Sequence, residues 1–509
     1  MTKFYAFTLS FFLFSGIIAQ DFTITDPTFG INGRAIIDQG VAASGSDNEG
    51  RRTMHVRSDD KILVIGTGKE SGTDYDLFVG KFLSNGIVDT NFGNGGSVFI
   101  DCGGTADVAM GSDIGPNGEI FITGTYIDPF GTGFKNILVV SLNADGTVNT
   151  NFSDDGILTL NISATSTSEG RDIKVLPNGK ILVAFRTSSA NSNPGIDFAV
   201  MKLNANGTFD DTFGVNGAVV IPDPVTPEEV YKLAIQDDGK IVLGGLKNSS
   251  PQSYQFVKLT ETGELDPDFG TEGIATLTHN DGNIPNLFNL SIEPDGKIIA
   301  GGNITMGVGS SLASVVRLNP DGTPDETFGT LGRVSLGLPT TARAVLKDNF
   351  DNYYIIGTDF GSVVSTKISG VGSLMNLFGV SGTANFGNTI PNGVDVCGAM
   401  QPDGKYLIAG RVSQTGFQRY GVLRAGGPGI GISNLDSSSL TIYPNPAQNF
   451  ITFEKDGLDK STYTISDLQG RLVGDGTAYE TTTISTELLK EGMYLLRVNG
   501  EIVKIIIDK

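Results

Sequence analysis

The sequence predicts an all-β protein in which a seven-bladed β-propeller of four-stranded blades precedes a small β-sandwich. Three observations lead to this fold class. A unit of about sixty residues recurs seven times, each unit holds short apolar runs separated by tight turns, and 69 of the 509 residues are glycine. That glycine content is about twice the protein average. Repetition of a unit built from several short strands is typical of a propeller.

The first marker of the repeat is an Asp or Asn followed, three residues later, by Phe-Gly and then by a further glycine. Asp89, Phe92, Gly93 and Gly96 form one clear copy. Successive copies lie 50 to 63 residues apart, which sets the length of the unit. The marker phenylalanines are Phe29, Phe92, Phe152, Phe213, Phe269, Phe328 and Phe378.

A second marker keeps the same spacing and consists of an Asp-Gly or Asn-Gly type of turn followed by an apolar run, as in DGKIVLGG and DGKIIAGG. Both dipeptides tolerate the positive φ of a tight hairpin turn. The runs are short, β-branched and continuously apolar, as expected for inner or middle strands that are buried on both faces. The seven copies begin at Asp59, Asn117, Asn178, Asp238, Asp295, Asp351 and Asp403.

Two further strands, the third and the fourth, are predicted in each unit. The third strand is predicted in runs such as DLFVGKFL from Asp76 and DFAVMKLN from Asp197, which are followed by a glycine turn. The fourth strand follows the Phe-Gly marker, where apolar residues alternate with others, as at Val98 and Ile100. This alternation indicates one buried and one wet face, as in an outer-edge strand. Four antiparallel strands make one propeller blade.

The phase of the repeat predicts how the ring closes. The first strand of the fourth type, residues 33–38, precedes any complete unit, whereas the last unit ends without such a strand. We therefore expect the N-terminal strand to join the last blade, because two unpaired blade edges would expose backbone donors and acceptors. The propeller is expected to span residues 21–425.

The paired markers resemble those of the delta-60 repeat family, whose units resemble propeller blades. The copies at Phe152, Asn352 and Phe378 depart from the family pattern. The resemblance implies no single activity and no fixed catalytic residues, and a fold of this kind does not specify a function.

The two ends of the predicted propeller carry segments of different composition. Residues 1–20 have the pattern of a signal peptide, with Lys3 before an apolar run at 4–18 and Ala19 at the cleavage position. The run is short for a membrane-spanning helix, which needs about 20 residues, so we expect export and no transmembrane segment. Residues 426–439 are rich in Gly and Ser and predict a flexible linker.

Residues 440–509 predict a small Ig-like β-sandwich, because alternating strands are joined by Asn-Gly and Gln-Gly turns. The segment resembles the type A C-terminal sorting domain of the type IX secretion system in Bacteroidetes. The resemblance implies passage through the type IX machinery, removal of the domain, and release or attachment at the outer surface; an Ig-like binding module that stays attached is the alternative. The family's motifs match at Tyr443, Pro444, Asn445, Pro446, Gly470, Gly492 and Tyr494.

The charge and cysteine content limit the classes of partner. With 56 acidic and 35 basic residues the net charge is −21, which opposes binding of nucleic acid at long range. Cys102 and Cys397 form neither a disulfide scaffold nor a zinc cluster, since a structural zinc site needs four ligands and only His55 and His279 are available to supplement them. We expect both cysteines to be unpaired core residues.

Acidic turns at Asn143, Asn204 and Asn319 offer oxygen atoms at alternate positions, which suits calcium. The closing Glu of a complete calcium loop is missing, however, and Asp and Asn at such places stabilise turns by bonding to their own backbone. We therefore expect structural turns and no cofactor, with calcium as the alternative.

Few residues predict catalysis. Arg51 and Arg52, beside His55, are expected in a solvated loop, with contact to an anionic ligand as the alternative. His55 and His279 lie in different repeats, and no Gly-x-Ser-x-Gly elbow precedes a helix, which disfavours nucleophilic catalysis by a histidine-activated residue.

The expected function is therefore that of a secreted or cell-surface binding scaffold without enzymatic activity, whose extracellular ligand, a glycan or a protein, lies over the central channel. The second hypothesis is a carboxylate-dependent polysaccharide hydrolase or lyase, which needs an acidic pair about 5 to 10 Å apart. The third is a structural adhesin component, which would assemble in a concentration-dependent manner.

Overall fold

The computed structural model describes most of the chain, and every regular element in the described residues is a β-strand. Residues 1–24, which hold the predicted signal peptide, and residues 427–439 of the predicted linker lie outside the description, as do His279 and Gly470. No helix long and apolar enough to cross a membrane occurs in the described segments. These segments are residues 25–37, 51–69, 74–129, 135–162, 167–187, 196–223, 226–278, 283–306, 310–359, 361–376, 378–387, 396–414, 417–426, 440–455, 457–458, 460–467, 472–498 and 501–509.

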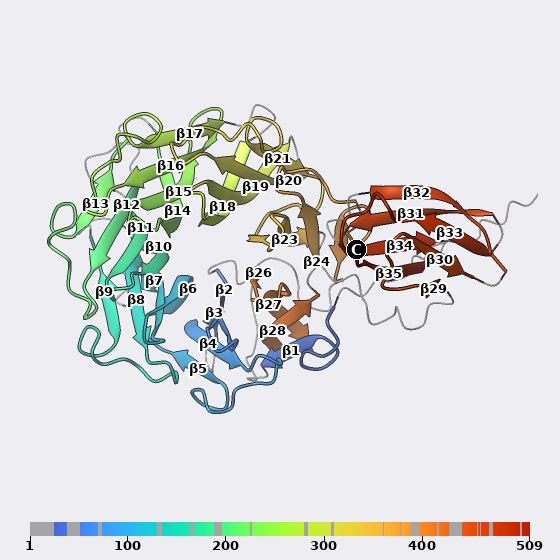
Figure 1. The fold of residues 1–509 in the computed structure, drawn as a ribbon. Helices are drawn as coiled ribbons and strands as arrows, with labels where there is room; N and C mark the ends of the chain where they lie inside the picture. Colours follow the sequence, from blue (N-terminus) through green and yellow to red (C-terminus); the bar gives the residue numbers. More distant parts are fainter. Residues whose placement is uncertain are drawn as a thin grey trace, which may run out of the picture.

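Seven four-stranded antiparallel sheets are arranged in a ring (Figure 1). In the first sheet, β2 (Thr53–Val56), β3 (Ile62–Gly68), β4 (Asp76–Phe82) and β5 (Ser97–Ile100) lie in chain order from the centre outward. Five sheets repeat this order: β6 (Ala106–Ile114), β7 (Ile120–Ile127), β8 (Lys135–Leu142), β9 (Ile157–Leu160); β10 (Ser168–Val175), β11 (Ile181–Thr187), β12 (Asp197–Leu203), β13 (Ala218–Ile221); β14 (Glu228–Ile235), β15 (Ile241–Lys247), β16 (Ser253–Leu259), β17 (Ile274–Thr278); β18 (Asn283–Ile292), β19 (Ile298–Met306), β20 (Ser310–Leu318), β21 (Arg333–Leu336); and β22 (Ala344–Lys347), β23 (Tyr353–Asp359), β24 (Ser362–Ile368), β25 (Thr383–Asn385).

The remaining sheet combines the two ends of the propeller. β1 (Arg34–Ile37) pairs antiparallel with β28 (Phe417–Ala425), which in turn pairs with β27 (Tyr406–Gln414) and then β26 (Cys397–Met400). This is the strand pairing that the phase of the repeat predicts. Strand β26 contacts both β22 and β2, so the innermost strands of the first and last sheets meet.

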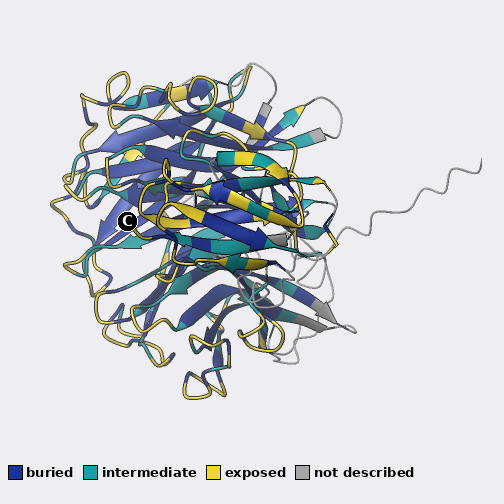
Figure 2. Cartoon of the chain, turned by 45° about the vertical axis from the view of Figure 1, so that its right-hand side comes forward, coloured by how far each residue is buried: buried dark blue, intermediate teal, exposed yellow. Residues whose placement is uncertain are grey.

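The core is formed by the middle strands and by the apolar layers between neighbouring sheets (Figure 2). Strand β12 is buried along its whole length, whereas the outer strand β1 alternates between buried and exposed positions. Burying one large side chain stabilises the fold by about 1.5 to 3 kcal/mol. Phe378 is half-buried, whereas the other six marker phenylalanines are at most 1% exposed: Phe29, Phe92, Phe152, Phe213, Phe269 and Phe328.

The two sequence markers recur together because their polar residues form an ion pair. Asp210 of the Phe-Gly marker lies 2.8 Å from Lys180 of the preceding turn and 3.9 Å from Lys202 on the third strand. Lys202 also donates to the carbonyl of Glu261 in the next sheet, at 3.3 Å. We call this arrangement a turn triad. The other copies are Asp26 with Lys405 and Arg424, Asp89 with Lys61 and Lys81, Asp266 with Lys240 and Lys258, and Asp325 with Lys297 and Arg317.

The irregular copy around Phe152 replaces this triad with neutral bonds. Asn149 stands at the marker position and donates to Ser141 Oγ at 3.0 Å, while Glu119 occupies the place of the turn lysine. Elsewhere the marker glycine adopts a positive φ, as at Gly93 (φ +52), where a Cβ would lie 2.4 Å from the carbonyl oxygen of Ser97. Ser153 keeps this conformation in the irregular copy (φ 49), so the loop is preserved without the glycine.

The C-terminal segment forms two sheets. β29 (Thr441–Tyr443), β30 (Phe450–Glu454) and β33 (Thr481–Ser485) form one, and β32 (Leu472–Ala478), β31 (Ser461–Asp467), β34 (Gly492–Val498) and β35 (Glu501–Ile507) form the other. Apolar side chains from both sheets share one core, including Phe453, Ile465, Leu496 and Ile505. This two-sheet arrangement agrees with the predicted sandwich.

Candidate functional site

The innermost strands bring together polar and aromatic side chains that do not repeat from one sheet to the next. Strands β2, β6, β10, β14 and β18 line the inside of the ring (Figure 1). At the register shift of these strands, the equivalent position is occupied by Met110 in β6, Arg171 in β10, Tyr231 in β14 and Phe288 in β18. This variation contrasts with the uniform middle strands, and the centre of the ring is therefore the region to examine for a site.

Arg51, just before β2, reaches across the ring. Its guanidinium carbon lies 4.8 Å from the ring centroid of Tyr231 on β14 and 5.8 Å from that of Phe288 on β18. Arg343 lies 3.9 Å from the Phe288 ring, and Arg171 lies 5.8 Å from the Tyr231 ring. We call these five residues the central arginine cluster. Each cation–π contact stabilises by about 0.5 to 2 kcal/mol.

The positive charge of this cluster is incompletely balanced. Burial, together with repulsion from Arg171 and Arg343, lowers the pKa of Arg51 to about 10, although Tyr231 and Asp172 oppose the shift. Arg51 therefore remains protonated at neutral pH. Its Nη1 atom is buried and has no hydrogen-bond partner in the described part of the chain. An anionic group would supply both the missing acceptor and the missing charge.

Two carboxylates beside this cluster, Glu169 and Glu229, are already held by cations. Arg186 lies 2.8 Å from Glu169 Oε1 and 3.3 Å from Glu229 Oε1, and Arg171 lies 3.2 Å from Glu169 Oε2. Burial raises the pKa of Glu169, but attraction to Arg171 and Arg186 outweighs it and the net pKa is lowered. Glu169 is therefore a poor proton donor at neutral pH. Tyr231 donates to Glu229 Oε2 at 2.6 Å, which orients its ring.

Two aspartates link neighbouring inner strands. Asp172 on β10 accepts the amide of Leu233 on β14 at 3.0 Å, and Lys232 Nζ lies 3.4 Å from its other oxygen. Asp113 on β6 similarly accepts the amide of Val175 on β10 at 2.8 Å. These carboxylates satisfy backbone donors between sheets, so their contacts are structural.

His55 contacts a hydroxyl group that sequence reasoning did not associate with it. Its Nε2 atom lies 2.8 Å from Ser112 Oγ in the next sheet, and that hydroxyl also bonds to Thr53 Oγ1. Burial lowers the pKa of His55 to about 4 although Asp113 opposes the shift. The imidazole is therefore neutral at pH 7. Ser112 is only 2% exposed, so this pair bridges two sheets and offers little access to a substrate.

Three expectations about individual residues can now be compared with the structure. Arg51 and Arg52 lie in a loop before β2, as expected, but both are half-buried: Arg51 packs on two aromatic rings and Arg52 lies 5.2 Å from the ring of Tyr420. Tyr231, Phe288 and Tyr420 come from other sheets, so no local pattern reveals these contacts. Neither Cys102 nor Cys397 is in a disulfide bond, as predicted, but both are half-buried rather than fully in the core. Burial raises the pKa of the Cys102 thiol, which keeps it protonated.

The turns considered for calcium use their polar side chains internally. Asn143 donates to Thr147 Oγ1 at 2.9 Å and to the carbonyl of Val148 at 3.3 Å. Asn204 and Asn319 make the same pair of bonds in their own turns. These contacts are the backbone-stabilising role expected of Asn in tight turns.

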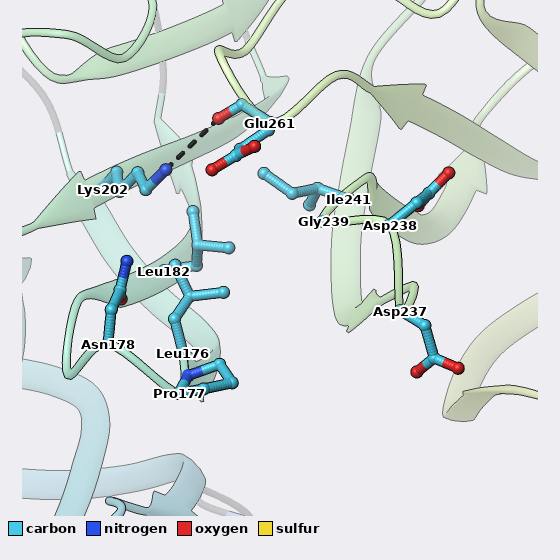
Figure 3. A pocket seen from close by; sticks show the side chains of 10 residues that line it. All are labelled: Leu176, Pro177, Asn178, Leu182, Lys202, Asp237, Asp238, Gly239, Ile241 and Glu261. Atoms are coloured by element: carbon cyan, nitrogen blue, oxygen red, sulfur yellow. Dashed lines mark hydrogen bonds between the residues drawn. The ribbon is translucent and has the colours of Figure 1, made fainter.

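A cavity of about 290 Å³ lies away from the centre, between turns of the third and fourth sheets (Figure 3). Lys202 and Glu261 line it, and Figure 3 shows the hydrogen bond between them. The same bond occurs in other copies, from Lys81 to the carbonyl of Ala144 and from Lys258 to that of Pro320. The contact between Lys202 and Glu261 at this cavity is therefore a feature of the repeat.

In the C-terminal domain, the predicted sorting residues lie around the last strand. Asn445 donates to the carbonyl of Lys504 at 2.8 Å and accepts the amide of Ile506 at 2.8 Å, both on β35. Tyr443 bonds to Glu454, and Pro444 and Pro446 each follow a cis peptide bond. On β34, Gly492 pairs with Ile507 and the Tyr494 hydroxyl donates to the carbonyl of Lys490 at 2.9 Å.

Comparison with solved structures finds distant resemblances only. Drosophila Semaphorin 2a is 8% identical, with 92% of this chain and 97% of that chain covered and a TM-score of 0.43. A polysaccharide lyase of family PL25, an ulvan lyase, is 14% identical, with 76% and 95% covered and a TM-score of 0.41. A glucose dehydrogenase is 13% identical, with 59% and 95% covered and a TM-score of 0.37. No curated protein matches the sequence.

Two family matches are more specific. Residues 176–213, 236–269 and 293–328 match the family described as "Domain of unknown function (DUF5122) beta-propeller", and each segment runs from a turn marker to a marker phenylalanine or just beyond. Residues 441–508 match the family described as "Secretion system C-terminal sorting domain". The chain thus carries DUF5122 β-propeller repeats followed by a type IX secretion sorting domain, which assigns it to secretion or the cell surface.

Proposed function

We propose that this protein is an extracellular binding scaffold, without enzymatic activity, that holds an acidic group of a glycan at the central arginine cluster. The single observation that carries this proposal is the position of Arg51, which crosses the ring between two aromatic side chains with a buried nitrogen for which the described residues supply no acceptor.

The chemistry of the cluster suits a sugar acid or a sulfated sugar. Guanidinium groups bind carboxylate and sulfate oxygens through paired, charge-assisted hydrogen bonds. Tyr231 and Phe288 provide apolar ring surface beside these donors. The net charge of −21 repels polyanions at long range, so binding of an acidic glycan would depend on this local site and not on general attraction.

The proposal is tested with the full mature chain by titration calorimetry against acidic and neutral extracellular glycans, with parallel assay for newly released reducing ends. We expect binding of an acidic glycan without product. Arg51→Met should weaken binding at least tenfold, whereas Arg52→Met, which alters the neighbouring arginine outside the cluster, should leave it unchanged.

The other hypotheses give different results in the same experiment. Release of product would overturn the non-enzymatic assignment and favour the carboxylate-dependent hydrolase or lyase. Equal binding by wild type and Arg51→Met would overturn the proposed site. Assembly that increases with protein concentration, without glycan binding, would favour a structural adhesin or a protein ligand.

We also propose that residues 1–20 are removed on export and that the sorting domain acts through the motif around Asn445 and Tyr494. Asn445 joins the motif loop to β35 through two backbone contacts. Asn445→Ala should therefore reduce the amount of protein at the cell surface or in the medium, measured by immunoblot of cell fractions. Asn449→Ala, in the same domain, is the matched control and should be exported normally.

A further inference from the structure

An acidic cluster lies between the first and second sheets. It is distinct from the turns at Asn143, Asn204 and Asn319, which were considered above as calcium sites. Asp76 begins β4, Asp101 follows β5, and Asp107 lies on β6. One carboxylate oxygen from each lies within 4.8 Å of the others. We call this group the acidic corner.

The innermost member of this group has an unsatisfied oxygen. Asp107 is 0% exposed, and its Oδ2 atom accepts the amide of Cys102 at 2.7 Å. Its Oδ1 atom is buried and has no hydrogen-bond partner among the described residues. A buried carboxylate oxygen without a partner is strongly unfavourable, so this atom points to a ligand that supplies positive charge.

At the junction between the third and fourth sheets, a lysine of the chain itself contacts a similar group of carboxylates. Asp197 begins β12 as Asp76 begins β4, Asp223 follows β13, and Glu228 lies on β14. Here Lys247 Nζ lies 2.5 Å from Asp223 Oδ2 and 3.4 Å from Glu228 Oε1. An ammonium group of the chain itself therefore contacts two of these three carboxylates.

Strand register identifies the residue that replaces this lysine in the acidic corner. Lys247 is the cross-strand partner of Glu228, and Tyr126 is the cross-strand partner of Asp107. Both pairs lie two residues ahead of the β-bulge of their strands. The acidic corner thus retains its carboxylates but has a tyrosine where the corresponding corner has its cation.

The junction between the second and third sheets provides a neutral reference. Asn136 stands near the start of β8, and Ser168 on β10 is hydrogen-bonded to its cross-strand partner Thr187 at 3.1 Å between hydroxyl oxygens. Asn136 and Ser168 thus stand where the other two corners have carboxylates. Of the corners compared, the one between the third and fourth sheets combines carboxylates with a lysine of the chain.

We propose that the acidic corner binds a calcium ion through Asp76, Asp101 and Asp107, in the role that Lys247 has in the corresponding corner. Calcium binds oxygen ligands at about 2.3 to 2.6 Å, so two ligands of one ion lie up to about 5 Å apart, which the observed spacing satisfies. Calcium suits the site better than magnesium, because magnesium demands near-ideal octahedral geometry and is seldom held by protein ligands alone. The inference is independent of the glycan ligand.

The test is titration of calcium-free, full-length mature protein with CaCl2 by calorimetry, together with thermal unfolding in EDTA, CaCl2 or MgCl2. We expect calcium to bind with a Kd of about 10⁻⁴ to 10⁻³ M, as in extracellular modules. The Tm should be higher in CaCl2 than in EDTA. Magnesium at the same concentration should raise the Tm less. An absence of binding heat and of any Tm shift would overturn the proposal, and an equal shift with magnesium would overturn the choice of calcium.

Two variants identify the site. Asp101→Asn changes an exposed ligand and should weaken calcium binding at least tenfold while the protein still folds. Tyr126→Lys should supply an internal cation, so that the Tm becomes insensitive to calcium. The reciprocal change, Lys247→Met, should create a second calcium-dependent increase in Tm. Unchanged calcium affinity in Asp101→Asn would show that the ion binds elsewhere and would overturn the assignment.

Discussion

Charged side chains have different roles in the turn triads and in the central arginine cluster. Five turn triads place one aspartate against two cations at equivalent positions of the repeat, as in Asp210 with Lys180 and Lys202. The central cluster gathers three arginines on two aromatic rings, and Arg171, Tyr231 and Phe288 occupy one register position whose residue type differs between sheets. In this repeat protein, charged residues that recur from unit to unit stabilise the unit. Charged residues that occur in only some units, such as the central arginines, mark a candidate site.

The two regions also differ in how their charge is balanced. In a turn triad, hydrogen bonding to Lys180 outweighs burial and holds the pKa of Asp210 below its usual range. In the central cluster, burial and mutual repulsion lower the pKa of Arg51 instead. The triads are therefore complete within the chain, while the cluster gains from an additional anion. The following experiments test this distinction, from the largest expected effect to the smallest.

Removing residues 20–38 should have the largest effect, because it deletes both β1 and the Asp26 turn triad. We expect a loss of several kcal/mol in the free energy of unfolding, since burial of Ile37 alone is worth about 1.5 to 3 kcal/mol and β28 loses its edge partner. Urea unfolding measures the change. A protein that lacks only residues 1–20 is the control. An unchanged urea midpoint after removal of residues 20–38 would contradict closure of the ring by the pairing of β1 with β28.

Asp210→Ala should destabilise the protein by about 2 kcal/mol without changing ligand binding. The substitution leaves Lys202, whose side chain is 7% exposed, without its carboxylate partner. Breaking a fully buried pair costs about 3 to 5 kcal/mol, and the exposure of Lys180 reduces the effect. Chemical denaturation provides the measurement. Asp211→Ala, at the exposed neighbouring position, should change stability by less than about 0.5 kcal/mol; equal effects at both positions would refute the role of the triad.

Ser153→Gly should stabilise the irregular copy by about 0.5 to 1 kcal/mol. Ser153 holds the positive φ that glycine adopts in other copies, and a non-glycine residue in this region is disfavoured by about 1 to 2 kcal/mol, partly offset by the greater entropy of unfolded glycine. Thermal unfolding would detect the change. Asn151→Gly, in the same loop but without a positive φ, should be destabilising, and a stabilised Asn151→Gly would contradict the argument.

Arg51→Met should have the smallest effect on folding, below about 1 kcal/mol in either direction, while it has the largest effect on anion binding. Burial of the charge opposes folding and the cation–π contacts favour it, so the two nearly cancel. Urea unfolding of wild type and variant provides the comparison. A loss of several kcal/mol would place Arg51 among the structural residues and remove the distinction between the two regions.

Local chemistry explains why so much of the fold could be predicted. Turn dipeptides, alternation along strands and the spacing of Phe92 and its counterparts each depend on residues close in sequence, and seven repetitions reinforce the pattern. The phase of these copies also predicted the pairing of β1 with β28. The departure at Phe152 did not remove the blade, because Asn149, Ser141 and Ser153 preserve its geometry by other means.

The candidate sites depended on contacts that no local pattern contains. Arg51 was expected in a solvated loop, yet ring closure places it against Tyr231 and Phe288 from distant repeats. The acidic corner likewise needs Asp76, Asp101 and Asp107 from two sheets, and its missing cation is recognised only through strand register.

The sequence by itself therefore determined the repeat, the strand order within each unit, the closing strand and the sorting domain, because each rests on short-range periodicity or a local motif. Tertiary structure alone decided which irregular side chains meet at the centre and between sheets. The physical reason is that curvature of the closed ring brings together inner-strand residues far apart along the chain, where burial makes every unbalanced charge energetically significant.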